Sequence, residues 1–239
     1  MKLRKWKALL SKDFKLILNN KNILLLLMLP ILFAVIYSSS MDLGDDPKGI
    51  YFLLVMITAL GMMVVGSSLM ALSIAEEKEK KTLRSLVLSD ISGFAFIACK
   101  MIIITILFTL AMTASFFIVG APMHYLGKYL LMLLLTTVSL LFFGSIVGLL
   151  SQTQQSAGVL GTPLMLLFAI PLFSLMGDIE ILNKIAKLLP TGPITFLMLQ
   201  DGGAQISYSN LVGFGSMAAW ILIAGVIFLV FYRKKSIDN

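Results

Sequence analysis

Six long apolar runs constrain this chain more than any other feature of its sequence. A helix needs about 20 residues, at about 1.5 Å each, to cross a hydrocarbon core of roughly 30 Å, and each run approaches that length. The runs are apolar on every side, whereas a helix of a soluble domain keeps one polar face. We expect them to span a membrane, at residues 23–37 (extending to 40), 50–75, 96–120, 129–150, 157–176 and 211–232.

The composition favours the same class of protein. Of the 239 residues, 59% are hydrophobic and 13% are charged, whereas soluble domains average about a quarter charged. A soluble domain is therefore excluded, and an all-α membrane fold with six transmembrane helices is expected. The single Cys99 excludes an intrachain disulfide. No cluster of Cys and His suits a metal, so no metal, cofactor or catalytic residue is assigned.

The positive charges are divided unevenly between the two ends of the expected bundle. If the N-terminus is cytoplasmic, 15 of the 19 Lys and Arg residues fall on the cytoplasmic side and four on the outer side. Cytoplasmic loops of membrane proteins carry the excess of Lys and Arg, so both termini are expected in the cytoplasm (N-in, C-in). The net charge of +7 reflects this clustering beside the spans, and no nucleic-acid partner is expected.

Residues 1–22 form an amphipathic segment that precedes a six-span domain at 23–239. Its apolar residues recur at helical spacing between Lys and Arg residues, and they are Leu3, Trp6, Leu10, Phe14 and Ile17. We predict a helix in the membrane interface, with Trp6 at headgroup depth and Leu10 and Phe14 among its interface residues. It serves either as an orientation signal and anchor or as a frame for a cytoplasmic docking surface. A cleaved signal peptide at the first run is less favoured, because five further spans follow it.

A charged segment at 76–93 separates the second and third runs. Three acidic residues precede three basic residues, and some opposite charges fall three and four positions apart, which places them side by side on a helix. A small apolar stripe follows. A short cytoplasmic helix with this pattern would suit docking of another protein, and a solvated helix end with internal ion pairs is the alternative. The charged residues are Glu76, Glu77, Glu79, Lys80, Lys81 and Arg84, and the stripe is Leu83, Leu86 and Val87.

This segment resembles the membrane subunit of type-2 ABC transporters. The family pattern is approximately an acidic residue, a basic residue, Gly-Thr-Leu, a Leu, Thr-Pro-Ile-Ser and a later Gly-Lys. The chain has Thr82-Leu83, Leu86, Ser89-Asp90-Ile91-Ser92 and Lys100, with Lys81, Asp90 and Cys99 where the family has Gly, Pro and Gly. The amphipathic N-terminal helix, the six spans and the long outer segment before the last span extend the resemblance over the whole chain.

The resemblance implies a permease subunit of an ATP-driven exporter for a hydrophobic or amphipathic peptide, drug or lipid. The chain has no G-x-x-x-x-G-K-[ST] loop, so ATP and Mg²⁺ are expected on a partner subunit. A second permease copy or a homologous permease, and membrane lipids, are the other implied partners, in a bacterial plasma membrane. The residues implied to contact a groove of the cytoplasmic ATPase are Glu76, Glu77, Thr82, Leu83, Arg84 and Leu86.

The outer segment at 177–210 is too long for a plain connection in a compact protein. Apolar residues at helical spacing lead to a break at Pro190, Gly192 and Pro193, and Pro193 suits the first turn of a further helix. We expect two short helices, interfacial or re-entrant, which resemble the external helical hairpin of the family. One amphipathic helix resting on the outer leaflet is the alternative.

Small residues and prolines give two further expectations for the spans. Gly144-x-x-x-Gly148, with Gly61 and Gly66, permits close helix approach, and we expect packing within the chain rather than a dimer seam. Two prolines inside the fifth span, at 163 and 171, predict a kink or a break.

Two other classes of function fit the residues less well. An intramembrane protease would place an Arg four residues after Glu76-Glu77, whereas Arg84 follows Glu77 by seven, and the only histidine, His124, is expected on the opposite face. A secondary transporter or ion-extruding protein without an ATPase is the alternative function. Such carriers keep ionisable groups within their spans. These spans have none near the middle, and Lys100 is expected to reach the cytoplasmic interface.

Overall fold

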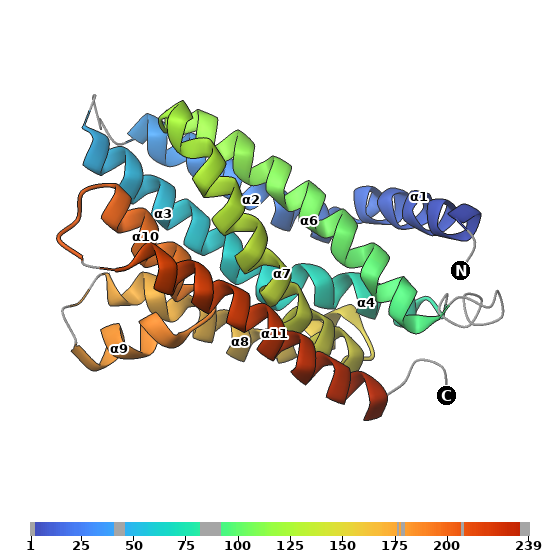
Figure 1. Ribbon diagram of the computed structural model, residues 1–239. Helices are drawn as coiled ribbons and strands as arrows, with labels where there is room; N and C mark the ends of the chain where they lie inside the picture. The colour runs from blue at the N-terminus through green and yellow to red at the C-terminus, as the bar shows by residue number, and fades with distance from the viewer. Residues whose placement is uncertain are drawn as a thin grey trace.

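The computed structural model describes residues 3–40, 46–81, 92–175, 177, 180–206 and 208–234, with side chains from residue 6 onward. Regular structure in these residues is helical throughout (Figure 1). Six segments are long and apolar enough to cross a membrane, which confirms the predicted all-α, six-span fold. They are α2 (Lys21–Ser40), α3 with α4 (Pro47–Glu79), α6 (Gly93–Ile118), η2 with α7 (Met123–Leu150), α8 (Gln154–Ser174) and α11 (Asn210–Lys234).

Polar residues fix where the spans begin. The Asn20 carboxamide oxygen accepts hydrogen bonds from the backbone N–H groups of Asn22 and Ile23, at 2.9 and 3.1 Å, and so caps α2. Asp46 caps α3 and Ser92 caps α6 in the same way. The second span therefore starts earlier than its apolar run predicts. α8 is continuous from Gln154 to Ser174, so the prolines inside it do not break the helix.

Three shorter helices lie at the two ends of the bundle (Figure 1). α1 (Leu3–Asn19) lies against α6 at the end that also carries the C-terminal end of α11. α9 (Glu180–Leu188) and α10 (Gly192–Asp201) lie at the opposite end. α1 and the C-terminal end of α11 thus lie at the same end of the bundle, as an even number of spans requires. The assignment of that side to the cytoplasm stays a prediction from the charge distribution.

The second span is the centre of the bundle, and it contains a π-helical turn, η1 (Val65–Leu69), between α3 (Pro47–Val64) and α4 (Met70–Glu79). Glycines bring α7 and α8 close to this turn. A methyl group added at Gly161 of α8 would lie 2.6 Å from the Ser67 carbonyl oxygen, and one added at Gly144 of α7 would lie 3.2 Å from the Gly66 carbonyl oxygen. Further along α7, a methyl group at Gly148 would lie 2.8 Å from Ile74 Cβ of α4. The expectation that Gly144 and Gly148 pack within the chain is confirmed, since Gly144 faces Met70.

Gly161→Ala should destabilise the bundle, because the added methyl group meets backbone that side-chain rotation cannot move. We expect a loss of about 1–3 kcal/mol, measured as a lower melting temperature of the detergent-solubilised protein. Gly158→Ala is the matched control one turn earlier on α8, where no atom lies within 4 Å of the added group. It should be neutral or stabilising by up to about 1 kcal/mol. Equal melting temperatures for the two variants would contradict the packing.

Candidate functional site

The last turn of α4 is a run of charged residues that face different neighbours. Successive residues of an α-helix are rotated by about 100°, so the four residues Glu76–Glu79 point to all sides of the helix axis. We call these four residues the charged turn. It ends the second span and forms the first part of the segment 76–93, which is expected to dock an ATPase.

Glu77 connects the charged turn to α1 and α6. Its Oε1 lies 2.7 Å from Lys100 Nζ on α6, and its Oε2 accepts a 2.7 Å hydrogen bond from Lys12 on α1. The side chains of Glu77 and Lys100 are both fully buried. Lys100 also donates to the Ser73 hydroxyl at 3.0 Å, and its ammonium lies 5.0 Å from the centre of the Phe96 ring.

Asp13 adds a second buried carboxylate to this group. It lies on α1, 3.4 Å from Lys12 Nζ and 3.7 Å from Lys100 Nζ, and its side chain is fully buried. Neither carboxylate oxygen accepts a hydrogen bond from the side chains that the structure describes. Burial raises the pKa of Asp13, the nearby Lys100 and Lys12 oppose the rise, and Glu77 adds to it. We call Lys12, Asp13, Glu77 and Lys100 the ion-pair cluster.

Glu76 connects the charged turn to the start of α2. Its Oε2 accepts a 2.6 Å hydrogen bond from the Asn20 amide, and its Oε1 pairs with Lys80 at 2.5 Å. Asn20 is also the residue that caps α2 through its carbonyl oxygen. One buried asparagine therefore joins the junction of α1 and α2 to the end of α4.

The last two residues of the charged turn bind the ends of α7 and α8. Lys78 Nζ donates to the carbonyl oxygens of Gly148, Leu149 and Ser151, at 2.9, 2.5 and 3.0 Å, where α7 ends. Glu79 accepts a 3.0 Å hydrogen bond from the Gln154 N–H, where α8 begins. The cation sits at the negative end of one helix dipole and the carboxylate at the positive end of the next. Through four consecutive residues, α4 thus contacts α1, α2, α6, α7 and α8.

The predicted coupling residues are only partly inside the described region. Glu76 and Glu77 are buried among helices, and one ion pair at the expected helical spacing forms, between Glu76 and Lys80. Thr82, Leu83, Arg84 and Leu86 lie outside the described residues. The expectation that Lys100 reaches the interface is wrong, because its ammonium turns inward to Glu77.

The N-terminal helix differs in part from the interface helix that its pattern predicts. Trp6 and Leu10 are half-buried and Phe14 is 44% exposed, so one side of the apolar stripe is open to lipid. The other side is buried in the bundle and carries Asp13 between Leu9 and Ile17, four residues from each. Sequence reasoning missed Asp13 as a site residue. The available signal was that Asp13 is the only acidic residue among the first 22.

The outer segment forms the two short helices that its pattern predicts. Gly192 is required at the turn between them, because a methyl group there would collide with the Ala186 carbonyl oxygen. Pro193 occupies the first turn of α10, as expected. Pro190 is buried beside this turn, and Thr191 donates a 3.0 Å hydrogen bond to the Phe168 carbonyl of α8. The helices are therefore anchored to the spans.

Residues 36–232 match the family model described as ABC-2 family transporter protein. Among the curated proteins, none matches the chain.

Lys100→Met should destabilise the protein by about 3 kcal/mol, because it leaves the Glu77 carboxylate buried without its closest cation. The double variant with Glu77→Leu should lose less than the sum of the two single changes, as measured by denaturant unfolding. Lys184→Met, which removes an exposed pair with Glu180, is the control and should cost less than about 1 kcal/mol. Strictly additive effects would contradict the buried pair.

Asp13→Asn should change how stability depends on pH. In the folded protein the pKa of Asp13 is raised above 3.8, so the fold holds this proton more tightly than the unfolded chain does. The stabilisation is present below the ordinary pKa and is lost as pH rises through the raised folded pKa. Melting temperatures across the acidic range should show this decline in the wild type and a flatter profile in Asp13→Asn. Glu180→Gln, at an exposed position, should retain the wild-type profile.

Proposed function

The chain belongs to the ABC-2 family of transporter proteins, and from that premise we propose that it is the permease subunit of an ATP-driven exporter. A separate cytoplasmic ABC ATPase would bind and hydrolyse ATP, since the chain has no phosphate-binding loop motif. A second permease, identical or homologous, would complete the membrane unit. The proposed location is the plasma membrane of a bacterium, with both termini inside.

The observation that carries this proposal is the position of the charged turn. It forms the start of the segment Glu76–Leu88, which the family resemblance implies to contact the ATPase, and it precedes residues 82–88 by two positions. Its side chains hold the ends of α7 and α8 and link α4 to α1, α2 and α6. A displacement of α4 at Glu79 would therefore act on five helices through direct side-chain contacts.

The proposed mechanism is transmission of motion along the second span. Closure of two ATPase subunits would push residues 82–88, and the charged turn would carry the push to the surrounding helices. The π-helical turn at Val65–Leu69 lies between the moving end and α3. Such turns are often found at functional sites and mark where a helix can bend, so we place the pivot there. Substrate would pass along the seam between two permease copies or leave laterally from the membrane.

The polarity of the spans supports a hydrophobic or amphipathic substrate. Charged side chains in the described spans lie toward their ends, and Lys100, the deepest on α6, is paired with Glu77. A carrier driven by an ion gradient needs an ionisable group placed to bind and release that ion. The ion-pair cluster instead joins three helices at one end of the bundle. This supports an external energy source over the alternative of a secondary transporter.

Leu83→Asp and Leu86→Asp test the docking segment. Burying an unpaired carboxylate in a protein interface costs more than about 1.4 kcal/mol, so ATPase recovery on co-purification should fall about tenfold or more. Transport-coupled ATP hydrolysis should fall with it, while the melting temperature of the permease stays unchanged. Charge reversal at Glu76 or Glu77 is a poorer test of docking, because both residues are buried among helices.

Ser85→Asp is the matched control for these variants. It adds the same charge, but at helical spacing it lies away from the stripe of Leu83, Leu86 and Val87. It should retain the ATPase. Normal recovery of the ATPase with Leu83→Asp and Leu86→Asp would reject the docking assignment.

A further inference from the structure

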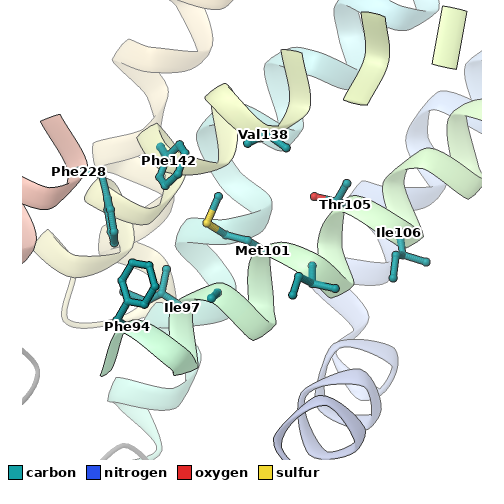
Figure 2. A pocket seen from close by; sticks show the side chains of 10 residues that line it. Phe94, Ile97, Met101, Thr105, Ile106, Val138, Phe142 and Phe228 are labelled. Carbon is teal, nitrogen blue, oxygen red and sulfur yellow. The ribbon is translucent and has the colours of Figure 1, made fainter. Parts of the chain in front are cut away.

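An apolar groove of about 410 Å³ lies between α6, α7 and α11 (Figure 2). Phe94 and Met101 on α6, Val138 and Phe142 on α7, and Phe228 on α11 are among its lining residues. We propose that this groove binds one acyl chain of an anionic membrane lipid, with the headgroup at the end of the bundle that carries both termini. This inference does not depend on the ATPase or on the direction of transport.

The groove has the direction and length of a lipid chain. Its lining on α6 runs from Phe94, in the first turn of that span, to Ile106. At about 1.5 Å per residue this is about 18 Å along the helix axis. Half of a hydrocarbon core of roughly 30 Å is about 15 Å, so the groove extends across about one leaflet. It follows α6, which itself crosses the membrane.

The lining excludes polar occupants. Thr105 is the only lining residue with a polar side chain. Figure 2 shows the Met101 thioether extending toward Val138 and Phe142, so a flexible, polarisable side chain forms part of the floor. Phe94 and Ile106 are 52% and 54% exposed, which leaves the groove open to the lipid phase along α6. A transmembrane helix of another protein is about 10 Å wide, which is too wide to enter the groove. Such a helix would place only its side chains in this space.

The charges at the open end favour an anionic headgroup. α11 continues beyond Phe228 to Arg233 and Lys234, and both are exposed. The N-terminal end of α6, capped by Ser92, lies at the same end of the bundle and carries the positive end of the helix dipole. Arg233 and Lys234 follow Phe228 by five and six residues, so at about 100° per residue they lie on sides of α11 that face away from the groove. Together with the N-terminus of α6 they make the electrostatic potential positive in the headgroup layer at this end, which favours a phosphate whose acyl chain follows the apolar lining.

Photo-crosslinking in the wild-type protein tests this proposal without any substitution. The protein is reconstituted in phosphatidylcholine vesicles with a trace of phosphatidylglycerol that carries a diazirine in its acyl chain. Mass spectrometry should place most adducts at 94–106 and 138–142. Excess unlabelled phosphatidylglycerol should compete about fivefold better than the same amount of phosphatidylcholine. Adducts spread evenly over the lipid-facing surface, or equal competition by the two lipids, would overturn the proposal.

Two substitutions separate the groove from the headgroup contact. Ala98→Phe fills the groove and should lower labelling about fivefold or more, whereas Ala219→Phe, the same change at an exposed position of α11, should not. Arg233→Gln should remove the preference for phosphatidylglycerol, and Lys184→Gln at the opposite end should retain it. Melting temperatures confirm that each variant folds.

Three further results would overturn the inference. They are unchanged labelling of Ala98→Phe, an undiminished lipid preference in Arg233→Gln, and efficient disulfide dimers through Ile106→Cys, which would place a second copy of the chain in the groove.

Discussion

The buried pair of Glu77 and Lys100 is the interaction on which the helix arrangement at one end of the bundle depends. This is the end that carries α1 and the C-terminal end of α11, and we call it the terminal end. Both side chains are fully buried, and removal of either would take from the other its closest opposite charge. Desolvation of a buried ion costs several kcal/mol, so this pair favours the arrangement in which α4 and α6 pack together. Lys12 and Asp13 extend the same preference to α1. The N-terminal helix is therefore part of the fold rather than only a membrane anchor.

The charged turn extends this dependence by a simple consequence of helix geometry. Four consecutive charged residues at about 100° intervals must face four directions, and at a buried helix end each direction holds a different helix. Lys78 and Glu79 bind helix ends of opposite polarity, so their order matches the dipoles of α7 and α8. Above this turn the close approach of glycines to the π-helical segment holds the same helices by backbone contact. The side chains of the charged turn fix the second span at its end, and the glycine contacts fix it at its middle. The pivot that we propose is the π-helical turn at this middle point.

Sequence reasoning located the parts of this structure that depend on local patterns. Apolar runs gave the six spans, spacing gave the pair of Glu76 and Lys80, and the prolines around 190–193 gave the start of α10. It missed the inward turn of Lys100, because its partners lie 23 and 87 residues away in the sequence, at Glu77 and Asp13. The amphipathic pattern of α1 has one apolar stripe, but that stripe serves two environments, lipid and bundle. Only tertiary contacts divide it.

α6 contributes to both the ion-pair cluster and the apolar groove, the two features of the terminal end that the sequence alone did not indicate. Lys100 faces the ion-pair cluster, and its neighbour Met101, about 100° further around the same helix, lines the groove. A rotation or shift of α6 large enough to separate Lys100 from Glu77 would also change the width of the groove. By the same geometry, an acyl chain seated beside Met101 would favour the position of α6 in which the buried pair is made. The surrounding lipid and the charged turn would then act on the same helix, although one contacts it from the membrane and the other from the protein interior.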